Sequence, residues 1–199
     1  MPSPSEALRS PELLHRQSSR LLVVDVQEKL VAALSDSSRE RLIANCRFLV
    51  EGATLFGIPV VATEQYPKGL GPTVVSLAEL ITERPAKTRF SALECTGWGT
   101  AAASSDDRFQ VVVAGMESHI CVLQTVLDLL AAGYQTFVVV DAIAGRRDLD
   151  HQIAVERMAN SGATLTTAEA ALFEWCESAS APEFKQLSAL VKGRGTMPA

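Results

Sequence analysis

The sequence lacks the features that mark nucleic-acid-binding, secreted and membrane-spanning proteins. Its 18 Lys and Arg residues are outnumbered by 23 Asp and Glu residues, and neither sign forms a long run. Proteins that bind phosphate backbones or membrane surfaces carry clustered Lys and Arg, so we expect neither nucleic acid nor a membrane as a partner. The N-terminal stretch MPSPSEALRSPELLHRQSS has no apolar core segment and predicts no signal peptide. We therefore expect a cytoplasmic protein with a flexible leader over residues 1–19.

Cysteine and histidine are also scarce, which excludes several kinds of site. The four cysteines show neither the paired spacing of a metal site nor the density of a disulfide framework: Cys46, Cys95, Cys121 and Cys176. Free thiols are the expected state of such cysteines in a reducing compartment. The three histidines form no metal-binding motif, and no glycine-rich segment has the spacing of a nucleotide-binding loop. We therefore expect no metal and no cofactor.

What the sequence does contain is an alternation of short valine-rich runs with longer segments of helical periodicity. The predicted strands are residues 21–26, 60–63, 110–115, 136–141 and 163–166. The predicted helices are residues 39–56, 75–81, 121–132, 150–160, 168–176 and 182–191. Between them, EQYPKGLGPT (64–73) predicts a loop, because it holds two prolines and two glycines.

This alternation decides the fold class. Strands that alternate with helices need crossover connections, which predicts a three-layer α/β/α sandwich with a mostly parallel, Rossmann-like sheet. A length of 199 residues with 47% hydrophobic content favours a single domain. We place this domain at residues 20–192, followed by a short tail at 193–199.

Polar residues at the ends of the predicted strands are the first candidates for a site, because ligands bind outside the carboxyl ends of strands in open α/β sheets. Asp25 and Gln27 follow the first run, and Glu64 and Gln65 follow the second. Residues 116–121 follow the run QVVVAG. These side chains are expected to converge on one edge of the sheet and to form a pocket for a small molecule.

Cys121, Asp25 and Lys87 have the chemistry of a nucleophilic site. Cys121 stands where a strand passes into a helix, and the N–H groups of a helix N-terminus lower the pKa of a thiol; the alternative is a small buried hydrophobe. Asp25 interrupts an apolar run, and a buried carboxylate needs a cation, which Lys87 would supply. The alternatives are that Asp25 caps a helix and that Lys87 is a solvated surface residue.

Four segments in the correct order resemble the isochorismatase-like cysteine hydrolases, above all the isochorismatase-domain-containing proteins. The segments are LLVVDVQEKL, VVATEQYPKGLGPTV, AKTRFSAL and GMESHICVLQTVLDLLAAG, and the similarity spans about residues 21–170. The resemblance implies a triad in which Cys121 is the nucleophile, Asp25 the base and Lys87 its partner. It also implies a cis peptide between Met116 and Glu117, with an oxyanion hole formed by the backbone N–H groups of Glu117 and Cys121.

Two departures from the wider family refine the expected activity. Nicotinamidases hold a metal through histidines in the loop after the second strand, but residues 64–73 contain none, which again predicts no metal. Isochorismatases proper need no nucleophilic cysteine, so its presence favours cleavage of a C–N bond in a small amide-like or carbamoyl substrate. Family members usually assemble, so a homo-oligomer is expected. The pocket is expected to be lined by Gln27, Glu64, Gln65, Tyr66, Phe90 and Met116.

Three other interpretations stay open at this stage. A different cysteine enzyme would use His119 or His151 as its base. A non-catalytic relative would keep the scaffold as an interaction module, although it would not need all three triad residues. A redox-sensing thiol protein would need a second cysteine near Cys121, and the sequence contains no C-x-x-C motif.

Overall fold

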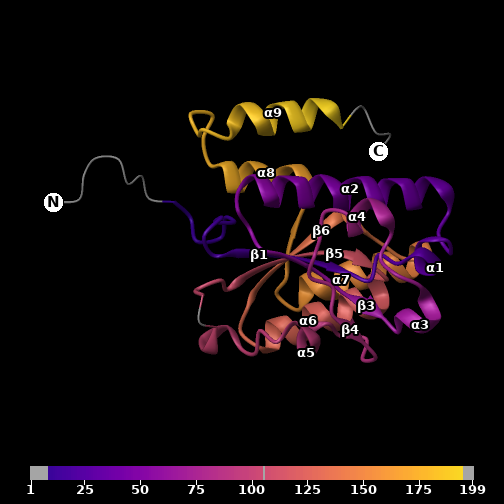
Figure 1. Ribbon diagram of the computed structural model, residues 1–199. Helices are drawn as coiled ribbons and strands as arrows, with labels where there is room; N and C mark the ends of the chain where they lie inside the picture. The colour runs from indigo at the N-terminus through magenta and orange to yellow at the C-terminus, as the bar shows by residue number, and fades with distance from the viewer. Residues whose placement is uncertain (1–8, 105, 195–199) are drawn as a thin grey trace.

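The computed structural model describes residues 9–104 and 106–194, which form a three-layer α/β/α sandwich (Figure 1). Its central sheet has the order β2-β1-β5-β6-β7, and every pairing is parallel. The strands are β1 (Ser19–Val24), β2 (Val60–Ala62), β5 (Gln110–Met116), β6 (Gln135–Ala144) and β7 (Thr164–Thr166). The predicted fold class is confirmed.

Burial on both faces explains why the inner strands β1 and β5 contain continuous apolar runs. Every residue of β1 and of β5 is buried. Side chains alternate between the two faces of a strand, so Leu21 and Val23 join one core cluster while Leu22 and Val24 join the other. A strand covered on both faces has no solvent side on which polar residues would be favoured.

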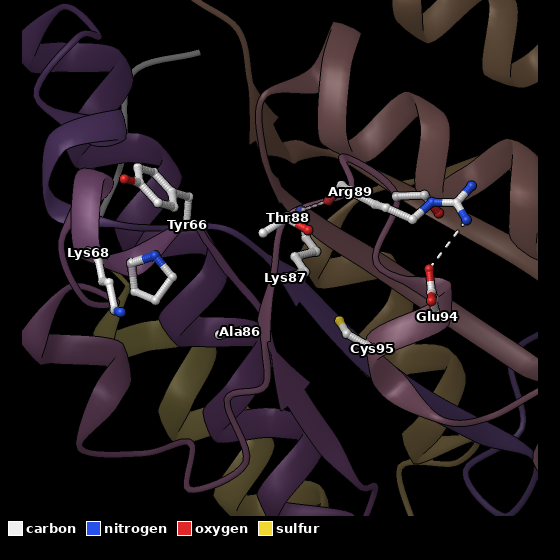
Figure 2. A pocket seen from close by; sticks show the side chains of 10 residues that line it. Tyr66, Lys68, Ala86, Lys87, Thr88, Arg89, Glu94 and Cys95 are labelled. Carbon is white, nitrogen blue, oxygen red and sulfur yellow. Dashed lines mark hydrogen bonds and ion pairs between the residues drawn. The ribbon is translucent and has the colours of Figure 1, made fainter.

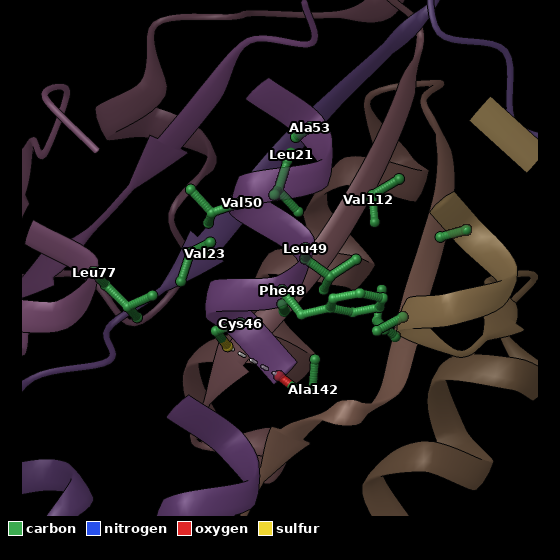
Figure 3. Close-up of a cluster of buried hydrophobic side chains, with 14 of the residues drawn as sticks. Leu21, Val23, Cys46, Phe48, Leu49, Val50, Ala53, Leu77, Val112 and Ala142 are labelled. Carbon is green, nitrogen blue, oxygen red and sulfur yellow. Dashed lines mark hydrogen bonds between the residues drawn. The ribbon is translucent and has the colours of Figure 1, made fainter. Parts of the chain in front are cut away.

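Helices cover both faces of this sheet (Figure 1). One core cluster lies beneath α2 (Asp36–Leu55), α8 (Ala168–Cys176) and α9 (Phe184–Gly193). Figure 3 shows Phe48 and Leu49 of α2 packed among the side chains of this cluster. The other cluster lies beneath α6 (Leu123–Ala131) and α7 (Asp148–Asn160). None of the described helices is long and apolar enough to cross a membrane.

Helix α2 begins three residues before the predicted start at residue 39. Its N-cap is Ser35, whose hydroxyl accepts a hydrogen bond from the N–H of Ser38 at 3.3 Å. Such a cap satisfies one of the N–H groups that a helix N-terminus leaves without a partner. The polar SDSS segment therefore starts the helix itself, rather than only preceding it.

The prediction of a loop at 64–73 missed two short elements. This segment contains β3 (Glu64–Gln65) and α3 (Pro67–Leu70), and β3 pairs in parallel with β4 (Ala86–Lys87). The other short elements are α1 (Glu28–Val31), α4 (Val75–Ala78), α5 (Leu93–Thr96) and the 3-10 turn η1 (Ala101–Ala103). Elements of two to four residues are too short to show periodicity in a sequence.

The proposed leader and tail lie partly outside the described residues, which exclude 1–8 and 195–199, so their boundaries stay a prediction. The described part of the leader is packed against the domain. Leu14 is fully buried, and its N–H donates to the carboxylate of Glu174 at 2.7 Å. At the other end, Arg194 donates to Asn45 at 2.7 Å and to Asp141 at 3.1 Å.

Candidate active site

Asp25 follows β1 directly and is fully buried. Its carboxylate accepts hydrogen bonds from two neighbouring side chains: Oδ1 from the hydroxyl of Thr63 at 2.7 Å, and Oδ2 from the ammonium of Lys87 at 2.6 Å. A buried carboxylate is stable only when a cation and hydrogen-bond donors replace the water it has lost. The structure thus places the predicted cation next to Asp25. Thr63, which follows β2 directly, is a partner that no pattern in the sequence indicated.

Lys87 is held on all sides by oxygen atoms. Besides Asp25, its Nζ donates to Gln65 Oε1 at 2.7 Å and to the carbonyl oxygens of Phe90 at 2.8 Å and Arg89 at 3.3 Å. The register of the small β3–β4 sheet places Gln65 opposite Lys87. The lysine side chain is only 3% exposed, so its charge is balanced inside the protein by that of Asp25.

Cys121 lies in a π-helix, η2 (Ser118–Val122), which connects β5 to α6. Burial raises the pKa of its thiol to about 12, and the negative charge and hydrogen-bonding oxygen of Asp25 add to this effect. Lys87 and the backbone of Glu117 act in the opposite direction but do not outweigh it. The prediction of a lowered thiol pKa was therefore wrong. The helical turn begins three residues before Cys121. For a nearly buried thiol, desolvation raises the pKa by more than the helix N-terminus lowers it.

Gly115 allows the strand ends that carry these groups to approach each other. It lies opposite Val24 in the β1–β5 pairing, with a φ of +115°. A Cβ atom at this position would collide with the backbone of Val24. Only glycine combines this conformation with so close a contact, and the contact lies next to Asp25. The peptide bond after the next residue, Met116–Glu117, is cis, as the resemblance implied.

A cleft of about 710 Å³ opens beside this buried group. Lys87 lines it, whereas Asp25 and Cys121 are not among its lining residues and are 0% and 5% exposed. In Figure 2, Tyr66 and Lys68 lie on one side of the cleft, and Arg89, Glu94 and Cys95 on the other. Of the three triad residues, only Lys87 is therefore part of the cleft wall.

The residues predicted to line the pocket divide into two groups. Tyr66 lines the cleft and is 56% exposed. Gln65 and Phe90 contact Lys87, but Phe90 does so with its carbonyl oxygen. Phe90 is 51% exposed and is not part of the cleft wall.

Gln27, Glu64 and Met116 do not line the cleft. Gln27 Oε1 accepts the N–H of Gln65 at 2.7 Å, and its Nε2 donates to the carbonyl of Gly71 at 2.6 Å. Glu64 accepts both the N–H and the hydroxyl of Thr73 at 2.8 Å. Met116 is fully buried in the core beneath α2. The two polar side chains thus satisfy the backbone of segment 64–73, whereas Met116 fills the core.

His119 belongs to η2 and His151 to α7, two elements that contact each other. His119 Nε2 is 3.9 Å from Asp150 Oδ2. Burial lowers the pKa of His151, and the charges of Arg41 and His119 add to this effect. Glu117, next to the π-helix, pairs with Arg146 at 2.5 Å. Within residues 9–104 and 106–194, no three His, Cys, Asp or Glu side chains are arranged to hold a metal ion.

Comparison with known proteins supports the resemblance that the four sequence segments indicated. The isochorismatase domain model matches residues 19–170. Isochorismatase domain-containing protein 2 of Bos taurus is 37% identical over 178 residues, covering 88% of this chain and 83% of its own. The secreted isochorismatase effector Isc1 of Phytophthora sojae is 37% identical over 180 residues, covering 88% and 85%.

Solved structures agree with this assignment. The structure described as MAR1 ribonuclease from Caenorhabditis elegans has a TM-score of 0.84 at 35% identity, covering 94% of this chain and 95% of its own. The YcaC gene product of Escherichia coli, described as an octameric hydrolase of unknown specificity, has a TM-score of 0.84 at 22% identity, covering 94% and 93%, which shows the shared fold. The chain therefore belongs to the isochorismatase-like hydrolase family.

Proposed function

We propose that the protein is a cysteine hydrolase that cleaves a C–N bond in a small amide-like or carbamoyl substrate. The observation that carries the proposal is the buried Asp25–Lys87 pair, with an Nζ–Oδ2 distance of 2.6 Å, next to the thiol of Cys121. A nucleophile, a base and a group that holds the base ionised are the parts that covalent hydrolysis needs. The burial of Cys121 and Asp25 favours a small reacting group.

The first step is attack by Cys121. With a pKa near 12, the thiol keeps its proton at neutral pH and faces the carboxylate of Asp25. Asp25 accepts this proton as the sulfur attacks the substrate carbonyl carbon, so that no free thiolate has to accumulate. The ammonium of Lys87 donates a hydrogen bond to the carboxylate and stabilises its charge before the transfer. The backbone N–H groups of Glu117 and Cys121 are proposed to stabilise the oxyanion.

The second step releases the products. The tetrahedral intermediate collapses, the C–N bond breaks, and the amine leaves with the proton from Asp25. A thioester on Cys121 remains, and Asp25 then accepts a proton from the water molecule that attacks it. The acid is released, and the proton returns to the sulfur of Cys121. No metal or cofactor enters this scheme.

The test is a comparison of the wild type with Cys121→Ala and a matched control, Cys176→Ala. Cys176 is also a buried thiol, but it lies in the core cluster on the other face of the sheet. Each protein is incubated with a library of amides, ureas and carbamoyl compounds, followed by intact mass spectrometry and an ammonia assay. We expect adducts or ammonia with the wild type and the control only. Full turnover by Cys121→Ala would contradict the proposal.

A second candidate activity comes from the C. elegans relative, which is described as a ribonuclease. Lys68 and Arg89, on the walls of the cleft, are the cations that would meet a phosphate group. The formal net charge of −5 disfavours binding of a polyanion. RNA cleavage that persists in Cys121→Ala and disappears in Lys68→Ala would favour the ribonuclease over the amidase.

Two further properties belong to the proposal. Assembly into a homo-oligomer is expected, and size-exclusion chromatography with light scattering would determine the subunit number. A non-catalytic scaffold is the outcome that remains if no member of the library reacts, RNA stays intact and iodoacetamide fails to label Cys121 even at alkaline pH. In that case the Asp25–Lys87 pair would serve stability alone.

A further inference from the structure

The sheet separates the four thiols into two pairs. Cys46 and Cys176 belong to the core cluster beneath α2 and α8. Cys121 belongs to the cluster on the opposite face, and Cys95 packs against that same cluster. The proposed mechanism uses Cys121 alone, so Cys95 is a nucleophilic group on the same side of the sheet that has no role in it.

Hydrogen bonds connect the segments that carry Cys95 and Cys121. Cys95 Sγ donates to the carbonyl of Ala92 at 3.1 Å, and the N–H of Ala92 donates to Thr125 Oγ1 at 2.9 Å. Thr125 Oγ1 in turn donates to the carbonyl of Cys121 at 2.6 Å. One threonine thus holds the short helix α5 against the turn that carries the nucleophile.

Both thiols also face the same charged pair. Cys95 lines the cleft together with Lys87, and Figure 2 shows the two side chains projecting towards the same part of it. The charges of Lys87 and Asp25 act on the thiol of Cys95, as they do on that of Cys121. Solvent reaches Cys95, which is half-buried, more easily than the nearly buried Cys121.

We propose that Cys95 is a resolving thiol, which forms a reversible disulfide with Cys121 when a peroxide oxidises the nucleophile. In the first step, Asp25 accepts the thiol proton of Cys121, and the sulfur attacks one peroxide oxygen. The O–O bond breaks, the leaving oxygen takes up that proton, and the products are a sulfenic acid and an alcohol or water. In the second step, the sulfur of Cys95 attacks that sulfenic acid, the S–O bond breaks, and water leaves. Two molecules of a small thiol then reduce the disulfide and become oxidised themselves.

A disulfide needs the two Cα atoms within about 7 Å of each other and the two side chains turned towards each other, so a segment that can move favours its formation. Helix α5 is suited to this movement. It is four residues long, none of its residues is fully buried, and Gly97 and Gly99 follow it with positive φ. Segments with few buried contacts open at a small cost in free energy. The disulfide would block hydrolysis and protect Cys121 from irreversible oxidation to the sulfinic acid.

The experiment treats the full-length wild type, Cys95→Ser and the control Cys176→Ala with hydrogen peroxide. The proteins are then alkylated without reduction, digested and analysed by mass spectrometry. The wild type and the control should yield a linked pair of peptides containing Cys95 and Cys121, two hydrogens lighter than the free thiols. Dithiothreitol should restore alkylation of Cys121 in both. In Cys95→Ser, Cys121 should become sulfinic acid, which dithiothreitol does not restore.

Sulfinic acid at Cys121 in the wild type, formed as fast as in Cys95→Ser, would overturn the inference, and so would a Cys121 that resists peroxide. The inference rests on the proposed nucleophile but not on the hydrolytic reaction, because the readout is a covalent link. A linked pair in a protein without hydrolase activity would support the disulfide and count against the hydrolase. Hydrolysis without a linked pair would support the hydrolase and count against the disulfide.

Discussion

Replacing Asp25 by asparagine should have opposite effects on the two reactions of Cys121. The change keeps the size of the side chain and removes its charge. Hydrolysis should disappear, because the amide does not accept the thiol proton. Alkylation by iodoacetamide should become faster, because the carboxylate raises the pKa of the thiol both by its charge and by its hydrogen bond. If Asp25 only supported the fold, its replacement would not make hydrolysis slower and alkylation faster at the same time.

The size of the increase follows from the pKa. A like charge a few ångströms away shifts a pKa by about one unit or more, which here raises the thiolate fraction about tenfold at neutral pH. Each thiolate becomes about threefold less nucleophilic as its pKa falls by one unit, so alkylation should accelerate about threefold overall. The charge of Lys87, no longer neutralised by Asp25, lowers the thiol pKa further. Threefold is therefore the lower end of the expected range.

The assay follows alkylation of Cys121 by intact mass spectrometry from pH 6 to pH 10, with Cys176→Ala as the control. Circular dichroism is needed alongside it to show that Asp25→Asn remains folded, because the variant leaves Lys87 buried beside a neutral amide. In the wild type, the alkylation rate should keep rising with pH, since the pKa of about 12 lies above the whole range. A folded Asp25→Asn protein that alkylates more slowly than the wild type would refute the proposed contact between Asp25 and the thiol.

Three further predictions concern the groups around the site. Lys87→Met should lower the free energy of unfolding by about 3–5 kcal/mol, measured by urea denaturation, because Asp25 becomes a buried charge without its cation. The control Lys68→Met, on the exposed wall of the cleft, should change this free energy little. Equal effects of the two substitutions would contradict the pairing of Lys87 with Asp25. Gly115→Ala should cost at least about 1–3 kcal/mol in the same assay, because its Cβ meets the backbone of Val24; an unchanged midpoint would show that the strands can separate at no cost. The pKa of His151 is lowered below its ordinary 6.5, so its contribution to stability is present above pH 6.5 and is lost as the pH falls further. The melting temperature of His151→Gln should therefore depend less on pH below 6.5 than that of the wild type. Identical curves of melting temperature against pH for the two proteins would exclude this role.

The sheet was predictable because its inner strands, β1 and β5, are buried on both faces. Continuous valine-rich runs such as 110–115, when they alternate with segments of helical periodicity, are typical of parallel strands covered by helices. The limits of prediction appear at Gln27 and Glu64. Both stand at strand ends, as the rule for α/β sheets requires, yet both turn inward to satisfy the backbone of segment 64–73. Side-chain direction in an irregular segment depends on contacts with residues distant in sequence, and no periodicity encodes it.

The presence of the two charged residues at the site was predictable, but their net effect on the pKa of Cys121 was not. A carboxylate within an apolar run has to meet a cation, and Lys87 was a candidate for it from the sequence. The direction of the pKa shift at Cys121 was not predictable, because it depends on how far burial and Asp25 outweigh Lys87 and the backbone. Those opposing effects vary with distances that only the folded chain defines.

The sequence by itself thus determined the parallel sheet, the strand ends that carry polar groups, and the motifs that resemble one family. These features are local, since they follow from runs of a few residues and their order along the chain. Only the tertiary structure decided that Gln65 lies opposite Lys87, that Cys121 keeps its proton, and that Cys95 shares the cleft with Lys87. Each of these depends on segments that are distant in sequence and become neighbours when the two faces of the sheet are covered.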